Sequence, residues 1–200
     1  IQTEHIPAIP LKGPVLATAV YGNLALRPFG DLDLLVHRRD ISRAADLLLS
    51  EGYRRLSRQD GKDIRVERPA DQRSPYEVDP QEVAYLGPQY HTFVRDDGRI
   101  IVDLQWRITR SSFSFSLDAE RLWERLEPIL LAGSTVFTFP PQDLSLILCV
   151  HGAKHMWEQL RWVCDVSELI QVQKGVDWGQ ALEQARKQGQ GRTLALGLYL

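Results

Sequence analysis

The segment 27–36, with the sequence Arg-Pro-Phe-Gly-Asp-Leu-Asp-Leu-Leu-Val, most constrains the fold of this chain. A turn containing Pro and Gly leads into an apolar strand, expected over 31–37, that opens with two carboxylates. Because side chains alternate between the faces of a strand, Asp31 and Asp33 are expected to stand side by side at its start. The apolar residues between and after them supply burial.

Two adjacent carboxylates are unfavourable unless a positive charge neutralises them. A hard divalent cation that prefers oxygen ligands, Mg²⁺ above all, is the usual solution. The pair Asp31 and Asp33 therefore indicates metal-assisted phosphoryl or nucleotidyl transfer. The open alternative is that both residues only decorate a turn and the start of a strand.

A third carboxylate, Asp103, lies within an apolar strand expected over 99–108. Asp is a poor strand former and a buried carboxylate needs a partner, so its place among Ile, Val, Leu and Trp residues favours a functional role. If this strand neighbours the strand 31–37 in one sheet, Asp31, Asp33 and Asp103 converge. They would then hold two Mg²⁺ ions, and Asp103 would also serve as the base that accepts a proton from an acceptor hydroxyl.

The order of the expected elements indicates an α+β fold, with a small mixed sheet flanked by helices over 1–110 and an all-helical part over 117–200. The periodicity of apolar residues and the turn signals predict the individual elements. These are an edge strand at 6–11, helices at 15–21 and 41–49, candidate strands around Tyr85, Tyr90 and Phe93, a hairpin turn at Asp97-Gly98, a linker at 111–116, helix 118–126, a short strand at 136–139, helix 142–170 with a bend at Gly152, and one or two helices over 178–200.

Bulk properties exclude some classes of partner. The net charge of −2 gives no general attraction to nucleic acid or to a membrane surface, and no apolar run approaches the roughly 18 residues that span a bilayer. The two cysteines, Cys149 and Cys164, lie in apolar helical sequence and are expected to be buried in a cytoplasmic protein. The chain ends at Leu200 within a periodic apolar stretch, so we expect the helical part to be truncated there.

Candidate phosphate ligands lie before the acidic strand. Lys12 and Gly13 follow the first strand and precede a helix, whose free N–H groups and partial positive charge attract phosphate. Arg27 could reach a triphosphate or pair with Asp31. A plain turn at Lys12-Gly13 is the alternative.

In the helical part, His151 and His155 are four residues apart and therefore share one helix face. Such a pair can bind zinc in a hydrolase, but no third ligand or intervening Glu follows at the usual spacing. The alternatives are packed, hydrogen-bonded histidines, or a face that lines the substrate cleft with His151, Lys154 and His155.

Three groups of residues carry a resemblance to a known family. They are Leu11-Lys12-Gly13 with Tyr21-Gly22 and Leu26–Val36, then Val102-Asp103-Leu104-Gln105-Trp106-Arg107, and finally Cys149–His155 with Leu160-Arg161-Trp162 and Asp165. Over roughly residues 6–170 the chain resembles the uncharacterised nucleotidyltransferases of the polymerase-β-like superfamily. The resemblance implies transfer of NMP from an NTP such as ATP to a hydroxyl or phosphate, with Mg²⁺.

One motif departs from the wider superfamily, where Gly-Ser or Gly-Gly usually follows the first strand. Here Lys12-Gly13-Pro14 takes its place, so phosphate binding and nucleotide choice stay open. We expect a small-molecule acceptor because no basic surface is evident. A tRNA end or a protein side chain is the alternative, since related toxin-type nucleotidyltransferases share the Lys-Gly and Asp-x-Asp pattern.

A non-catalytic nucleotide-binding or scaffold protein of the same fold is the rival from another class. The altered glycine turn favours it. The three carboxylates oppose it, because a binding module has little reason to bear their mutual repulsion.

Overall fold

The computed structural model describes residues 4–59, 62–65, 90–108, 117 and 119–200. The chain divides into two compact units, one formed by Ile1–Gly13 and Phe29–Arg107 and the other by Pro14–Pro28 and Ile108–Leu200. The expected division into 1–110 and 117–200 differs in one respect, because the segment Pro14–Pro28 groups with the helical unit. The expected linker 111–116, the helix start at Asp118 and the candidate strand near Tyr85 lie outside the described residues.

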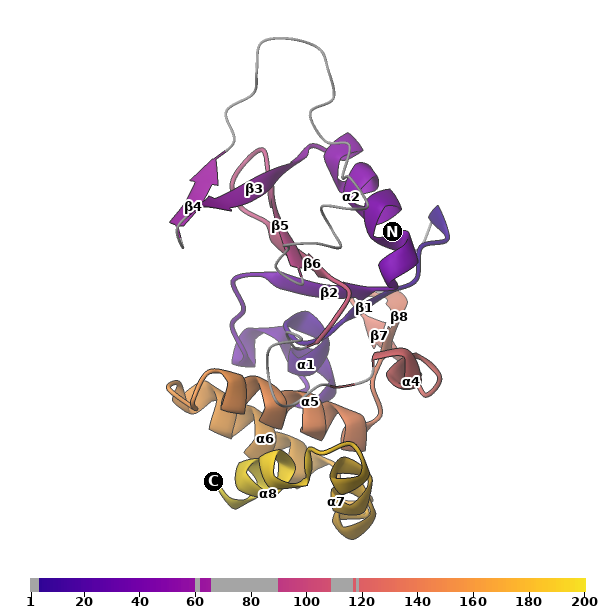
Figure 1. Cartoon of the computed structure of the whole chain (residues 1–200), viewed down its shortest axis with the longest axis vertical. Coiled ribbons are helices and arrows are strands. Elements are labelled where there is room, and N and C mark those ends of the chain that lie inside the picture. The colour runs from indigo at the N-terminus through magenta and orange to yellow at the C-terminus, as the bar shows by residue number, and fades with distance from the viewer. Residues whose placement is uncertain (1–3, 60–61, 66–89, 109–116, 118) are drawn as a thin grey trace. The chain divides into compact units, whose positions relative to one another are not determined.

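The first unit is built on a mixed sheet with the described strand order β1-β2-β6-β5-β3-β4 (Figure 1). Strands β2 and β6 are parallel, and the other neighbouring strands are antiparallel. The expected edge strand and both carboxylate-bearing strands are confirmed, each shorter than predicted. The elements are β1 (Ala8–Pro10), β2 (Leu32–Val36), η3 (Arg38–Asp40), α2 (Ile41–Ser50), β3 (Tyr53–Gln59), β4 (Lys62–Arg65), β5 (Tyr90–Arg95) and β6 (Ile101–Gln105).

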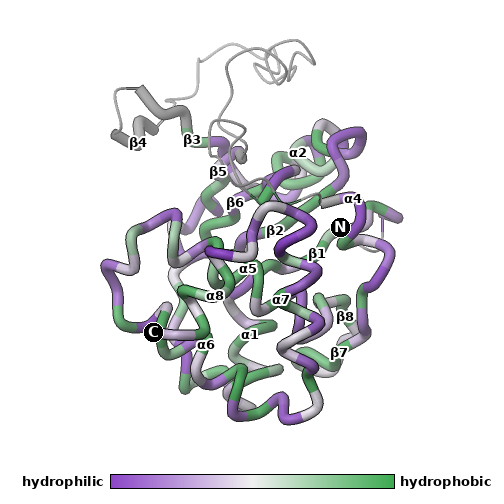
Figure 2. Tube along the Cα trace, turned by 60° about the horizontal axis from the view of Figure 1, so that its bottom comes forward, coloured by the Kyte–Doolittle hydropathy of each residue, from purple (hydrophilic) through white to green (hydrophobic). Residues whose placement is uncertain are grey.

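Helix α2 covers one face of this sheet and forms the core of the first unit. Its apolar stripe packs against side chains of β2, β5 and β6, and the alternation of apolar and polar residues along α2 can be followed in Figure 2. Leu32, Leu34 and Val36 of β2 belong to this core. Because strand residues alternate, Asp33 lies on the opposite face of the sheet.

Two glycines of the first unit have left-handed backbone next to its elements. Gly52 follows α2 with φ +80°, and Gly98 sits in the turn between β5 and β6 with φ +72°. Left-handed backbone of this kind strains residues that carry a Cβ. The Asp97-Gly98 signal therefore correctly placed the hairpin that brings β5 beside β6.

The second unit is mainly helical, and α5 packs against α6, α7 and α8. Most residues of α5 are buried. The elements are α1 (Pro14–Ala19), η2 (Leu24–Leu26), α4 (Ala119–Trp123), β7 (Glu127–Leu131), β8 (Ser134–Thr138), α5 (Pro141–Lys154), α6 (Leu160–Val172), α7 (Trp178–Lys187) and α8 (Gly191–Tyr199). The range 178–200, expected to hold one or two helices, holds the two helices α7 and α8.

Two expectations for this unit were wrong. It is not all-helical, because β7 and β8 form an antiparallel hairpin of which only the second strand was expected. The range 142–170 is not one helix bent at Gly152, because α5 ends at Lys154 and α6 begins at Leu160. Trp157 stabilises the break: its ring packs on Gly152, and its backbone N–H donates to the Gly152 carbonyl at 2.9 Å.

The two cysteines differ in their surroundings. Cys149 is buried, and burial raises the pKa of its thiol to about 12, which keeps it protonated and unreactive. Cys164 is exposed, contrary to expectation. Among the described residues, no helix combines the length and the apolar character needed to cross a membrane.

Candidate functional site

The two acidic strands are neighbours, as the candidate site requires. In the parallel pair β2 and β6, Asp33 is the register partner of Asp103, and Thr92 of β5 is the register partner of Asp103 on the other side. The three side chains therefore form a row across β2, β6 and β5, on the sheet face opposite α2.

Both oxygens of the Asp33 carboxylate have a partner. The Lys12 ammonium lies 2.8 Å from Oδ2, and Nε2 of Gln105 donates a hydrogen bond to Oδ1 at 3.1 Å. The Lys12 and Asp33 side chains are only 15% and 17% exposed, so water screens this ion pair weakly. Lys12, expected to contact phosphate, thus compensates the charge of Asp33 in this structure.

Asp103 is oriented by its neighbour on β5. The Thr92 hydroxyl donates to Oδ1 of Asp103 at 2.7 Å, and both residues are half-buried. A hydrogen bond to a carboxylate is strong and directional, so it fixes the rotamer of Asp103.

Asp31 lies just before β2 and is exposed. Gly13 approaches it: a Cβ on Gly13 would lie 3.6 Å from the Asp31 carbonyl oxygen, and Gly13 has φ +61°. This left-handed conformation favours glycine at position 13. Within the part of the chain that the structure describes, no three or more His, Cys, Asp or Glu side chains form a group that could hold a metal ion. The structure thus pairs Asp33 with Asp103 without gathering Asp31, Asp33 and Asp103 into a preformed metal centre.

The donors nevertheless match Mg²⁺ in kind. Carboxylate oxygens are its preferred protein ligands, and neighbouring strands lie about 4.8 Å apart, which lets side chains in register share one ion. The Lys12 ammonium against Asp33 shows that this carboxylate already attracts a positive charge.

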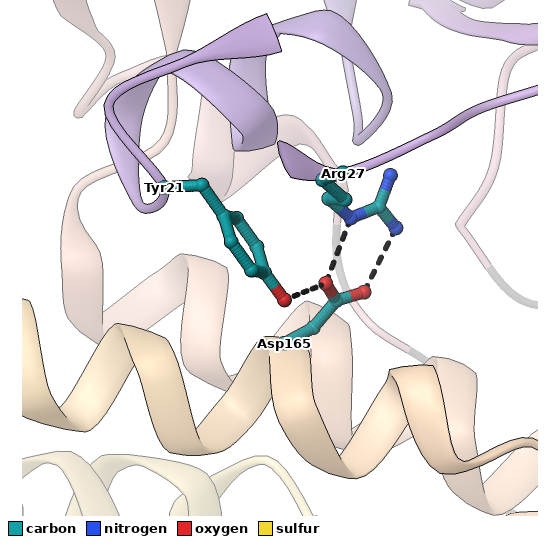
Figure 3. A network of polar contacts seen from close by, with 3 residues as sticks. All are labelled: Tyr21, Arg27 and Asp165. Atoms are coloured by element: carbon teal, nitrogen blue, oxygen red, sulfur yellow. Dashed lines mark hydrogen bonds and ion pairs between the residues drawn. The ribbon is translucent and has the colours of Figure 1, made fainter. Parts of the chain in front are cut away.

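Arg27 lies in the second unit, where its partner is Asp165. Its Nε and Nη2 donate to the two carboxylate oxygens of Asp165 on α6 at 2.7 and 2.8 Å, and the Tyr21 hydroxyl donates to Oδ1 at 2.8 Å (Figure 3). Asp165 is 1% exposed. Burial, and next the hydrogen bond to Asp165, raise the pKa of the Tyr21 hydroxyl, which therefore stays protonated. Arg27 is thus the cation beside Asp165, and the network ties the segment 14–28 to the helical unit.

The rings of His151 and His155, at the C-terminal end of α5, pack against the ring of Trp162 on α6. The ring centroids of His151 and His155 are 4.8 Å apart, and both rings pack against Trp162 at 5.4 and 5.2 Å. Ring packing matches the alternative of packed histidines, and no third ligand for zinc joins them among the described residues. The role expected for His151, Lys154 and His155 in lining the substrate cleft stays a prediction.

The sequence did not single out the two side chains that donate hydrogen bonds to the site carboxylates, Thr92 to Asp103 and Gln105 to Asp33. Gln105 carried a visible signal, because it is two residues beyond Asp103 on a strand and therefore shares its face. Thr92 carried none, because its place beside Asp103 depends on the register of β5 against β6.

The chain is similar to a family of known proteins and to a solved structure. No curated protein matches the chain. It is similar to a solved structure described as an antigenic nucleotidyltransferase-like protein from Paracoccidioides brasiliensis, at 14% identity and a TM-score of 0.47, over 99% of this chain and 86% of that one. The model of the family described as uncharacterised nucleotidyltransferase matches residues 1–200. With the match extending over its whole length, this chain belongs to that nucleotidyltransferase family.

Proposed function

We propose that this chain is an Mg²⁺-dependent enzyme that transfers NMP from an NTP to a hydroxyl or phosphate acceptor. The observation that carries the proposal is the register pair of Asp33 and Asp103 on one face of a parallel strand pair. Membership of the nucleotidyltransferase family supports the same reaction class.

In this proposal Asp31, Asp33 and Asp103 are the ligands of two Mg²⁺ ions. Bound Mg²⁺ would neutralise the triphosphate and favour loss of the proton from the acceptor hydroxyl. Asp103 takes that proton as general base, and the Thr92 hydroxyl keeps it oriented.

The triphosphate is assigned to Lys12 and Gly13. An ammonium on a flexible stem is a common phosphate ligand. Gly13 is buried in this structure, but it has no Cβ that would keep a phosphate away from its backbone. Arg27 is left out of this set, because two of its N–H groups are held by Asp165. A small molecule is the first candidate acceptor, since the net charge of −2 offers no general attraction to RNA. A tRNA end is the second.

A thermal-shift panel of the four NTPs, with and without Mg²⁺, tests the binding half of the proposal. A ligand at 100 times its Kd stabilises the fold by about 2.7 kcal/mol, which raises the Tm of a chain of this size by roughly 5–10 °C. We expect a rise that requires Mg²⁺ and disappears in Asp33→Asn. Asp46→Asn is the matched control, because Asp46 is an exposed carboxylate on α2. No Mg²⁺-dependent rise with any NTP would contradict the proposal.

The rival, a non-catalytic nucleotide-binding protein, is favoured by one observation. The Lys12 ammonium occupies the position beside Asp33 where a catalytic cation is expected. Pyrophosphate release during incubation with the stabilising NTP, screened against small-molecule hydroxyl acceptors and bulk tRNA, separates the two functions. Binding without release on any acceptor would favour the rival.

A further inference from the structure

The ion pair between Lys12 and Asp33 affects how a divalent cation can bind at Asp33. With the ammonium 2.8 Å from Oδ2 and Gln105 on Oδ1, the charge of Asp33 is compensated before any cation arrives. Both side chains are more than four-fifths buried, so the ion pair is exposed to little solvent.

A divalent cation at Asp33 would meet this ammonium at short range. Like charges in a poorly solvated site repel strongly, so the cation must displace Lys12 or bind weakly. A lysine stem has four rotatable carbons, so its ammonium can move without any change in the backbone. The displaced ammonium can then contact the triphosphate of an incoming nucleotide, which is the anion that arrives with the metal.

We propose that Lys12 is an exchangeable counterion. It neutralises Asp33 while the site is empty, and it transfers to the phosphate oxygens when a divalent cation takes its place on the carboxylate. This inference rests on the proposed function and adds that metal and nucleotide bind cooperatively. Metal alone binds poorly, and metal and nucleotide each raise the affinity of the chain for the other. Such coupling is reciprocal by thermodynamic necessity.

The test measures Mn²⁺ binding, from the spectroscopic signal of free Mn²⁺, with and without a non-hydrolysable NTP analogue. In the native chain the analogue should raise the affinity for Mn²⁺ by about 10-fold or more, within the usual range of coupling between sites. Lys12→Met removes the charge and keeps the length of the side chain. Mn²⁺ alone should bind this variant about 10-fold more tightly than the native chain, and the gain from the analogue should fall below about 3-fold.

Three further variants make the result decisive. Lys12→Arg keeps the positive charge and should retain weak binding of Mn²⁺ alone, and Lys12→Gln is a second neutral variant in case the Met variant does not fold. Lys187→Met is the control, because Lys187 is 74% exposed and pairs only along α7 with Glu183. It should behave like the native chain.

Two results would overturn the inference, and they differ in what else they reject. If the native chain shows coupling and the neutral Lys12 variants keep it unchanged, the exchange is wrong and the proposed function survives. If the native chain binds no analogue in the presence of Mn²⁺, the proposed function fails together with the exchange.

Discussion

Asp33 and Asp103 are register partners on β2 and β6, which run parallel. A parallel pair needs a crossover between its strands, and here the crossover contains α2, β3 and β5. The site is therefore assembled from segments about seventy residues apart in the sequence, and β5 returns beside β6 to add Thr92 to the row.

The first prediction concerns the Thr92 hydroxyl, which holds Asp103 at 2.7 Å. Thr92→Val keeps the shape of the side chain and removes the donor, so the carboxylate loses its fixed rotamer. Loss of a residue that orients a metal ligand typically costs 10–100-fold in metal affinity or activity. We expect a loss of about 10-fold or more in Mn²⁺ affinity measured with nucleotide present, with Thr92→Ser within about 3-fold of the native chain. Equal affinities of the Val variant and the native chain would show that Thr92 does not position Asp103.

The second prediction concerns the buried carboxylate of Asp165. Asp165→Ala leaves the Arg27 guanidinium and the Tyr21 hydroxyl without their acceptor. Breaking a buried ion pair from one side costs about 3–5 kcal/mol, so the Tm without nucleotide should fall by roughly 6–20 °C.

A comparison with an exposed pair checks this prediction. Arg43 is 59% exposed beside Asp40, so Arg43→Met should cost at most about 1 kcal/mol. The double variant Arg27→Met with Asp165→Leu should recover part of the stability lost in Asp165→Ala, because no unpaired charge stays buried. A native-like Tm in Asp165→Ala would show that the network does not stabilise the second unit.

The third prediction is a pH dependence centred on His91. Its side chain is buried beside Trp106, and the Arg55 guanidinium lies 2.7 Å from Nδ1. Arginine only donates, so Nδ1 accepts and the hydrogen resides on Nε2. Burial, and next the positive charge of Arg55, lower the pKa of His91 from 6.5 to about 4.

Between these two values the unfolded chain binds a proton that the folded chain does not. The contribution of neutral, buried His91 to the free energy of unfolding is therefore fully present above pH 6.5, and it is lost as the pH falls toward 4. The shift corresponds to a loss of about 3 kcal/mol in the free energy of unfolding. His91→Gln keeps an acceptor for Arg55 and cannot titrate. Urea unfolding at pH 7, 6, 5 and 4 should show a flatter acid side in this variant, and parallel curves would refute the assignment to His91.

The core of the first unit was readable from the sequence because its signals are local. The apolar alternation of β2, the helical stripe of α2 and the Asp97-Gly98 turn each follow from neighbouring residues. The pairing of Asp33 with Asp103 could be expected once both strands were recognised. The ion pair of Lys12 and the hydrogen bond from Thr92 could not, since they depend on register between strands and on rotamers. The alternation along β6 did place Gln105 on the face of Asp103.

The β7–β8 hairpin escaped sequence reasoning for physical reasons. Pro128 lies in β7, and proline removes a ladder donor and therefore argues against a strand. The turn is Ala132-Gly133 with both residues at positive φ, where Asn-Gly is the usual signal. Both strands are mostly exposed, so no apolar alternation marks them.

The fourth prediction tests the turn that separates α5 from α6. Periodic apolar residues run through both helices, and the residues that leave the helix, Met156 and Trp157, carry positive φ although neither type favours it. The Trp157 ring enforces the turn, because a Cβ on Gly152 would lie 2.5 Å from it. Gly152→Ala should therefore cost about 1–3 kcal/mol through overpacking, seen as a Tm lower by roughly 3–10 °C. Gly175→Ala is the control, since a Cβ there meets nothing within 4 Å. Equal Tm values for the two variants would mean that Trp157 does not hold the turn against Gly152.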